Sequence, residues 1–147
     1  MNFKTFLLNE SCDHKGRMLS DIYKFSDIEI EATHDFIQIV FPLAEPSFWS
    51  SNKYFIESQK QIDSLSKNKN VKEAILQSAS WYISFLKRNN HWKNVNDHNL
   101  KRITRMIKSV RLIVGDIEAD KIKKEITSIP NVEKLVGQKS IKYWKNA

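Results

Sequence analysis

Four polar side chains recur at helical spacing within an otherwise apolar segment of the chain. They are Glu31, His34, Asp35 and Gln38. Their spacing of i, i+3, i+4 and i+7 places them on one narrow stripe of a helix. Such a stripe can exchange hydrogen bonds with a peptide, and a histidine beside two carboxylates can titrate near neutral pH. The stripe is therefore a candidate ligand site. The simpler interpretation is a buried polar network that fixes the helix register.

The same stripe does not complete a catalytic site or a metal site. No nucleophile stands beside a base and an orienting group, and one helix offers at most two metal ligands here. The single cysteine, Cys12, excludes a disulfide framework and a zinc site built on several thiolates. No glycine-rich phosphate loop occurs. The sequence therefore predicts a non-enzymatic protein without a cofactor or a metal.

A second candidate surface is the segment 98–114, which divides into an apolar arc and a basic arc. The basic arc contains Lys101, Arg102, Arg105 and Lys108, with Arg111 at its margin. On an outer helix face these side chains would contact phosphates, giving salt-dependent binding that is independent of sequence. Trp92 and His91 would be available near its start for stacking on bases. The simpler interpretation is an ordinary solvated helix face. Membrane binding is disfavoured because the apolar arc is needed for the core.

The net charge is unevenly distributed along the chain. The 147 residues carry 24 Lys and Arg against 17 Asp and Glu, a formal charge of +7. Residues 1–73 have nine basic and eleven acidic side chains, whereas residues 74–147 have fifteen and six. The second part alone therefore carries +9, which favours a polyanionic partner such as nucleic acid.

The elements that must position these residues are predicted to be helices in a single compact domain spanning 1–147. Ser26 and Glu29 form a capping box that opens a helix over about 27–41, ended by Pro42. Its apolar residues cover more than half of the circumference, which indicates a buried central helix. Further helices are expected at 3–7, 18–25, 53–65, 70–87, 98–114, 117–129 and 140–145. With only three glycines and three prolines, the composition disfavours a sandwich or barrel of short strands.

Three end signals and one loop complete the helical prediction. Asn70 and Asp97 are expected to begin helices, and Gly115 is expected to end one. The loop 42–52 carries Phe48 and Trp49, which are expected to be exposed. No apolar run approaches the length of a membrane span, and the N-terminus does not resemble a signal peptide. We therefore expect a soluble, cytoplasmic protein.

Both candidate surfaces also resemble a known family. The segment 34–43, HDFIQIVFPL, resembles the HDYIQWLFPL signature of the opioid growth factor receptor domain, and 98–110, HNLKRITRMIKSV, resembles its HNxLRITRILKSL motif. Residues 3–9, 45–47 and 140–147 resemble further parts of the domain in the same order. Phe36 replaces the tyrosine of the signature, and Ile39 with Val40 replaces its Trp-Leu pair. The family tryptophan therefore has no counterpart at position 39.

The resemblance implies a helical domain that binds a peptide. Eukaryotic members of the family are described as nuclear-associated receptors for the pentapeptide Met-enkephalin, with no catalytic residues to transfer. The Lys- and Asn-rich composition indicates an AT-rich genome, and we expect a bacterial source. We therefore expect a binding module for a peptide or protein partner through the polar stripe. The alternative is a nucleic-acid-binding protein that uses the basic helix.

Overall fold

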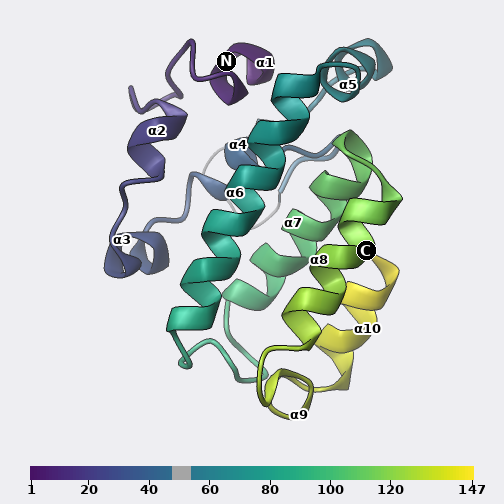
Figure 1. Cartoon of the computed structure of the whole chain (residues 1–147). Helices are drawn as coiled ribbons and strands as arrows, with labels where there is room; N and C mark the ends of the chain where they lie inside the picture. Colours follow the sequence, from purple (N-terminus) through teal and green to yellow (C-terminus); the bar gives the residue numbers. More distant parts are fainter. Residues whose placement is uncertain (48–53) are drawn as a thin grey trace. The chain divides into compact units, whose positions relative to one another are not determined.

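The computed structural model describes residues 1–47 and 54–147. Within these ranges the chain forms ten helices and no strand, so the predicted all-α fold class is confirmed (Figure 1). The chain divides into two compact units, Met1–Ser78 and Ala79–Ala147. Helix α6 (Lys69–Arg88) begins in the first unit and ends in the second. Among the described residues, no helix combines the length and the apolar composition needed to cross a bilayer.

The first unit is built from short helices joined by connections of different lengths. They are α1 (Phe3–Leu7), α2 (Leu19–Ile22), α3 (Asp27–Ala32), α4 (Ile37–Val40) and α5 (Gln59–Ser66), followed by the start of α6. Phe36 is fully buried, and the Phe25 ring meets it edge-on at 5.5 Å between centroids. The Tyr23 hydroxyl lies 2.6 Å from Ser78 Oγ, and burial raises its pKa although this hydrogen bond opposes the change. Short helices of this kind depend on packing for their stability.

The prediction of one continuous helix over 27–41 is wrong. The capping box forms as expected, since Ser26 Oγ accepts from Glu29 N at 3.2 Å and Ser26 N donates to Glu29 Oε1 at 3.3 Å. However, α3 ends at Ala32, and Thr33 is extended with φ −95° and ψ 123°. A physical reason is burial, because every residue from 35 to 43 is buried whereas Ile28 on α3 is 81% exposed. One straight helix with a single exposed side could not hide nine consecutive residues.

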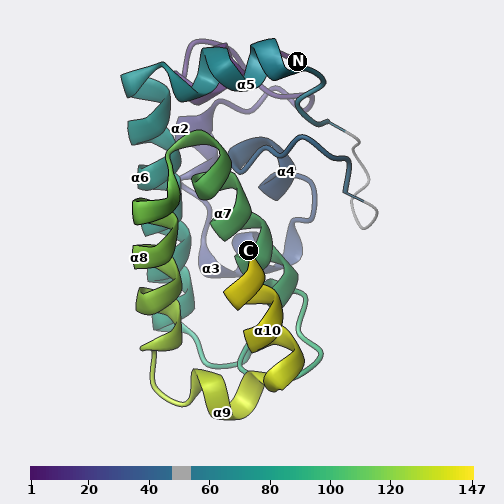
Figure 2. The ribbon, with the colours of Figure 1, turned by 90° about the vertical axis from the view of Figure 1, so that its right-hand side faces the viewer.

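The second unit centres on α7 (Asn99–Ile113). This helix packs against α8 (Asp116–Thr127) and α10 (Gln138–Asn146), as Figure 2 shows, and α9 (Val132–Val136) joins the latter two. Trp144 is buried and its Nε1 donates to the Leu100 carbonyl at 3.2 Å. Arg111 Nε donates to the Ala147 carbonyl at 2.9 Å, and Lys123 Nζ donates to the Lys145 carbonyl at 2.6 Å. Two cations therefore satisfy carbonyls at the end of α10, where they also complement the helix dipole.

Several helix limits agree with the sequence and others differ. The end of α7 agrees, since Gly115 N donates to the Val110 carbonyl at 3.0 Å. The N-cap of α7 is His98 and not Asp97 as predicted, although Asp97 Oδ1 accepts from Asn99 N at 2.8 Å. The predicted start at Asn70 is wrong, because α6 begins at Lys69 and Asn68 Oδ1 accepts from Val71 N at 3.0 Å.

The structure differs from the sequence-based prediction in two further segments. Helix α5 begins at Gln59 and not near residue 53, because the described residues 54–58 are not helical. The short helix α9 follows Pro130 and was not predicted, because its five residues are too few to establish a helical period. Phe48 and Trp49 lie outside the described residues.

Candidate functional site

The loop between α1 and α2 closes into a tight turn around the side chain of Asp13. Asp13 Oδ1 accepts from Lys15 N at 2.8 Å and from Arg17 N at 2.9 Å, and Asp13 N donates to the Arg17 carbonyl at 2.8 Å. Gly16 completes the turn with φ +77°, a backbone conformation that glycine adopts without strain. An aspartate that bonds to the backbone two and four residues onward is a local device for fixing a loop. The turn thereby fixes the side chains that follow Asp13.

Arg17 joins this turn to a second buried carboxylate, that of Asp35. Arg17 Nε donates to Asp13 Oδ2 at 2.7 Å, and Nη2 lies 2.7 Å from the same oxygen. Arg17 Nη1 donates to Asp35 Oδ1 at 3.0 Å. The planar guanidinium thus bridges two carboxylates that are almost inaccessible to solvent. A rigid fork of donors suits this role better than a lysine ammonium would.

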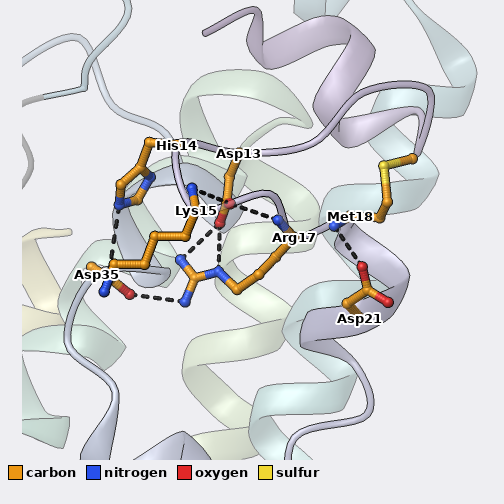
Figure 3. Close-up of polar contacts among 7 residues, drawn as sticks. All are labelled: Asp13, His14, Lys15, Arg17, Met18, Asp21 and Asp35. Carbon is orange, nitrogen blue, oxygen red and sulfur yellow. Dashed lines mark hydrogen bonds and ion pairs between the residues drawn. The ribbon is translucent and has the colours of Figure 1, made fainter.

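The second oxygen of Asp35 faces two other side chains from the same turn. Lys15 Nζ lies 2.6 Å from Asp35 Oδ2, and His14 Nε2 lies 3.5 Å from it. Figure 3 shows these side chains converging on Asp35. The Lys15 side chain is 61% exposed, whereas that of His14 is only 18% exposed. Because His14 as a whole residue is exposed, most of its exposed surface belongs to its backbone. The His14 ring also lies 5.4 Å from the Tyr54 ring.

We refer to Asp13, His14, Lys15, Arg17 and Asp35 as the Asp35 cluster. Burial of Asp35 opposes its ionisation, but hydrogen bonds and positive charge from Lys15 and Arg17 outweigh burial and lower the pKa of its carboxyl. The cluster therefore holds an ionised carboxylate just beneath the surface. One of its cations is fixed within the fold, and the other is largely in solvent.

The structure does not arrange the predicted polar stripe on one helix. Glu31 lies on α3 and is half-buried, while Gln38 lies on α4 and is buried. His34 and Asp35 lie in the connection between those helices, His34 exposed and Asp35 buried. The stripe prediction is wrong in this respect, because the break at Thr33 separates the four residues into three elements.

The partners of Asp35 were not identified from the sequence. The composition of residues 9–16 predicts only a polar loop, although Asp13 with Gly16 three residues later is a turn signal. That signal could have located the turn. It could not have located Asp35, which lies 18 residues beyond Arg17.

The predicted basic face of α7 is only partly at the surface. Lys101 and Lys108 are exposed, but Arg102 and Arg105 are buried, so the expectation of five outward cations is wrong. Arg111 is half-buried. Long arginine stems can lie along apolar surface, which a helical wheel does not register.

Arg111 takes part in contacts within the second unit. Its Nη1 lies 2.8 Å from Asp116 Oδ1 and its Nη2 lies 2.6 Å from Asp120 Oδ1. Hydrogen bonds to Asp120 and then Asp116 raise the pKa of Arg111, and the bond from Arg111 lowers the pKa of Asp120. Arg111 therefore stabilises the junction of α7, α8 and α10.

Of the two side chains expected to be available for stacking beside the basic helix, Trp92 differs from the prediction. Trp92 is fully buried and its Nε1 donates to the carbonyls of Leu86 and Asn89, each at 2.9 Å. It therefore closes the end of α6 and offers no face for stacking on a base. His91 is exposed.

A surface hollow of about 460 Å³ lies in the second unit, between the end of α6 and the end of α8. Lys87, Lys93 and Glu125 are among the residues that line it. Lys87 Nζ is 2.8 Å from Glu125 Oε1, and Lys93 Nζ donates to Asn90 Oδ1 at 2.9 Å. The lysines that line the hollow therefore contact other residues of its lining.

Comparisons with protein-family models, with curated proteins and with solved structures find no match to this chain.

Proposed function

We propose that this chain is a non-enzymatic binding module for a peptide or protein segment, similar to the opioid growth factor receptor domain, and that the Asp35 cluster is its recognition site. The observation that carries the proposal is the asymmetry of Asp35. Its carboxylate is buried, yet one of its cations, Lys15, is 61% exposed. A preorganised charge immediately below the surface is a common means of orienting a ligand.

The surroundings of Asp35 support a peptide as the ligand. His34 is exposed and adjacent to Asp35 in sequence, and the Tyr54 ring lies beside the ring of His14, a member of the cluster. These groups can donate to or accept from a peptide backbone, and the rings supply apolar contact area. The segment 34–43, which carries the resemblance to the receptor family, contains both His34 and Asp35.

Isothermal titration with unlabelled Met-enkephalin tests this proposal. We expect saturable binding, and we expect His34→Ala and Asp35→Asn each to weaken it at least about fivefold, as truncation of a central contact commonly does. The matched control is His91→Ala, an exposed histidine of the second unit. Folded variants with unchanged affinity, or no binding by the original chain, would contradict the proposal.

One observation favours nucleic-acid binding as a second candidate function. The second unit carries fifteen basic and six acidic residues, a net charge of +9, and Lys101 and Lys108 on α7 are exposed. Binding through phosphate contacts requires that affinity fall steeply with salt, by about 0.9 log units per contact for each log unit of salt.

A salt titration with a 20-base-pair duplex DNA tests this second candidate. Replacing both Lys101 and Lys108 by Gln is expected to lower the slope by about two, the loss of two phosphate contacts. The control replaces Lys24 and Lys67, exposed lysines of the first unit, by Gln. A slope near zero, or an equal effect of the control, would exclude this function.

A further inference from the structure

The two oxygens of the Asp35 carboxylate have partners of very different rigidity. Oδ1 accepts from Arg17 Nη1 at 3.0 Å, and the same guanidinium is held by Asp13 Oδ2 through Nε and Nη2, each at 2.7 Å. The Arg17 side chain is only 16% exposed. Arg17 is therefore held within the fold, and Oδ1 is engaged by a largely buried donor.

The partner on Oδ2 is held much less firmly. Lys15 Nζ lies 2.6 Å from Oδ2, but its side chain reaches there from the surface and is 61% exposed. An ion pair that involves an exposed lysine contributes little to stability, because solvation and side-chain entropy offset the attraction. The ammonium on Oδ2 can therefore be replaced by another at small cost.

Charge balance decides which ligand can take this place. The Asp35 cluster contains two carboxylates, one guanidinium and one ammonium, with the His14 imidazole beside them (Figure 3). A ligand ammonium that displaces Lys15 leaves this balance unchanged. A neutral ligand would leave a buried carboxylate with one cation fewer, and an anionic ligand would approach two carboxylates.

We infer that Oδ2 of Asp35 forms, with His14, a binding site for a primary ammonium group, and that Lys15 fills this site as an internal substitute for the ligand. The inference rests on the proposed peptide-binding function and specifies the group that is recognised. A peptide offers such a group in two ways, as the α-amino group at its N-terminus or as a lysine side chain. Both have the same charge and the same hydrogen-bond donors.

Nuclear magnetic resonance titration of the isotope-labelled full chain tests the inference directly. The signals followed are the side-chain carboxyl carbon of Asp35 and the Nε–H of Arg17. The probes are glycinamide for an α-amino group, Nα-acetyl-lysine amide for a side-chain ammonium, and N-acetylglycinamide as the neutral control. We expect saturable shifts with one or both amines, the two arms identifying the source, and none with the neutral control.

Variants of the cluster sharpen the test. Lys15→Met removes the internal competitor and is expected to tighten amine binding about two- to fivefold, which corresponds to the loss of an exposed ion pair. Lys24→Met, at an exposed lysine of the same unit, is expected to change nothing. Asp35→Asn is expected to abolish the shifts. Should Asp35→Asn fail to fold, Lys15→Met decides the question alone.

Each outcome separates this inference from the proposed function. Equal shifts with N-acetylglycinamide, or no saturable shift with Lys15→Met, would overturn the inference. If Met-enkephalin binds while neither amine probe does, the inference fails and the proposed function stands. If the amines bind at Asp35 and the pentapeptide does not, the ammonium site stands and the peptide proposal fails.

Discussion

Asp35 remains ionised in a buried position because its charge is compensated from one short turn. Arg17 and Lys15 both belong to the turn formed by residues 13–17, so a single loop supplies both cations. The effect of burial alone would raise the pKa of this carboxyl, and the cations reverse it. Removing the carboxylate charge would leave Arg17 buried with less compensation, which is costly in a protein interior.

Asp35→Asn is expected to lower the free energy of unfolding by about 3 kcal/mol at pH 7, because it breaks a buried ion pair on one side. Urea denaturation measures the loss. Lys15→Met, which removes an exposed partner of the same carboxylate, should cost less than about 1 kcal/mol. Equal losses for the two variants would show that Asp35 is not held by a buried pair.

Acid should reduce the difference between the original chain and Asp35→Asn. Because the folded pKa of Asp35 lies below its ordinary value, the carboxylate stabilises the fold fully above the unfolded pKa of about 3.9. This contribution is lost as the pH falls through the lower folded pKa. Urea midpoints measured from pH 7 down to pH 2 should therefore converge below about pH 4. A constant difference across that range would contradict the assignment.

At the scale of the elements, the sequence predicts what is decided locally. The capping box at Ser26, the hydrogen bond from Asn99 N to Asp97 Oδ1 and the ending of α7 before Gly115 all involve residues within a few positions of each other. The all-helical class follows from the same local signals. The break after α3 could not be predicted in this way, because Asp35 is drawn toward partners 18 and 20 residues earlier in the chain.

The basic helix illustrates a second limit of local patterns. A helical wheel places Arg102 and Arg105 opposite the apolar arc, and their polarity then predicts that they face solvent. Arg102 and Arg105 are nevertheless buried, and only Lys101 and Lys108 of the predicted face are exposed. The wheel recovers the apolar arc, but it does not decide which cations are covered.

Ser26→Ala tests the local cap of α3. It removes the oxygen that accepts from Glu29 N, and we expect the free energy of unfolding to fall by about 1 kcal/mol. The matched control is Ser80→Ala on the exposed side of α6, where alanine favours the helix slightly and no loss is expected. Equal urea midpoints for the two variants would mean that the cap contributes nothing.

At the scale of the whole molecule, the charge boundary and the structural division coincide. Residues 74–86 carry no charged side chain, and the division between the units falls inside this stretch. The first unit has a net charge of −2 and the second +9, because residues 74–78 add no charge to either count. Self-repulsion among the lysines of the second unit opposes its compact state, most strongly at low ionic strength.

Lys139 and Lys142 provide a test of this repulsion. They are exposed and three residues apart on α10, where like charges destabilise a helix. Replacing both by Gln is expected to raise the free energy of unfolding by about 0.3 kcal/mol at 10 mM salt. The gain should disappear at 0.5 M salt because screening removes the repulsion. A gain that persists at high salt would have a cause other than charge.

The closed turn at Asp13 has a consequence for proteolysis. Lys15 and Arg17 are trypsin sites on a surface loop, and such loops are the usual places of nicking. A protease, however, binds its substrate as an extended strand. Here the amides of Lys15 and Arg17 both bond to Asp13, and Gly16 has φ +77°. The loop must therefore open before the peptide bond after Lys15 or after Arg17 can be cleaved. The network that holds Asp35 thus also protects the surrounding chain from digestion.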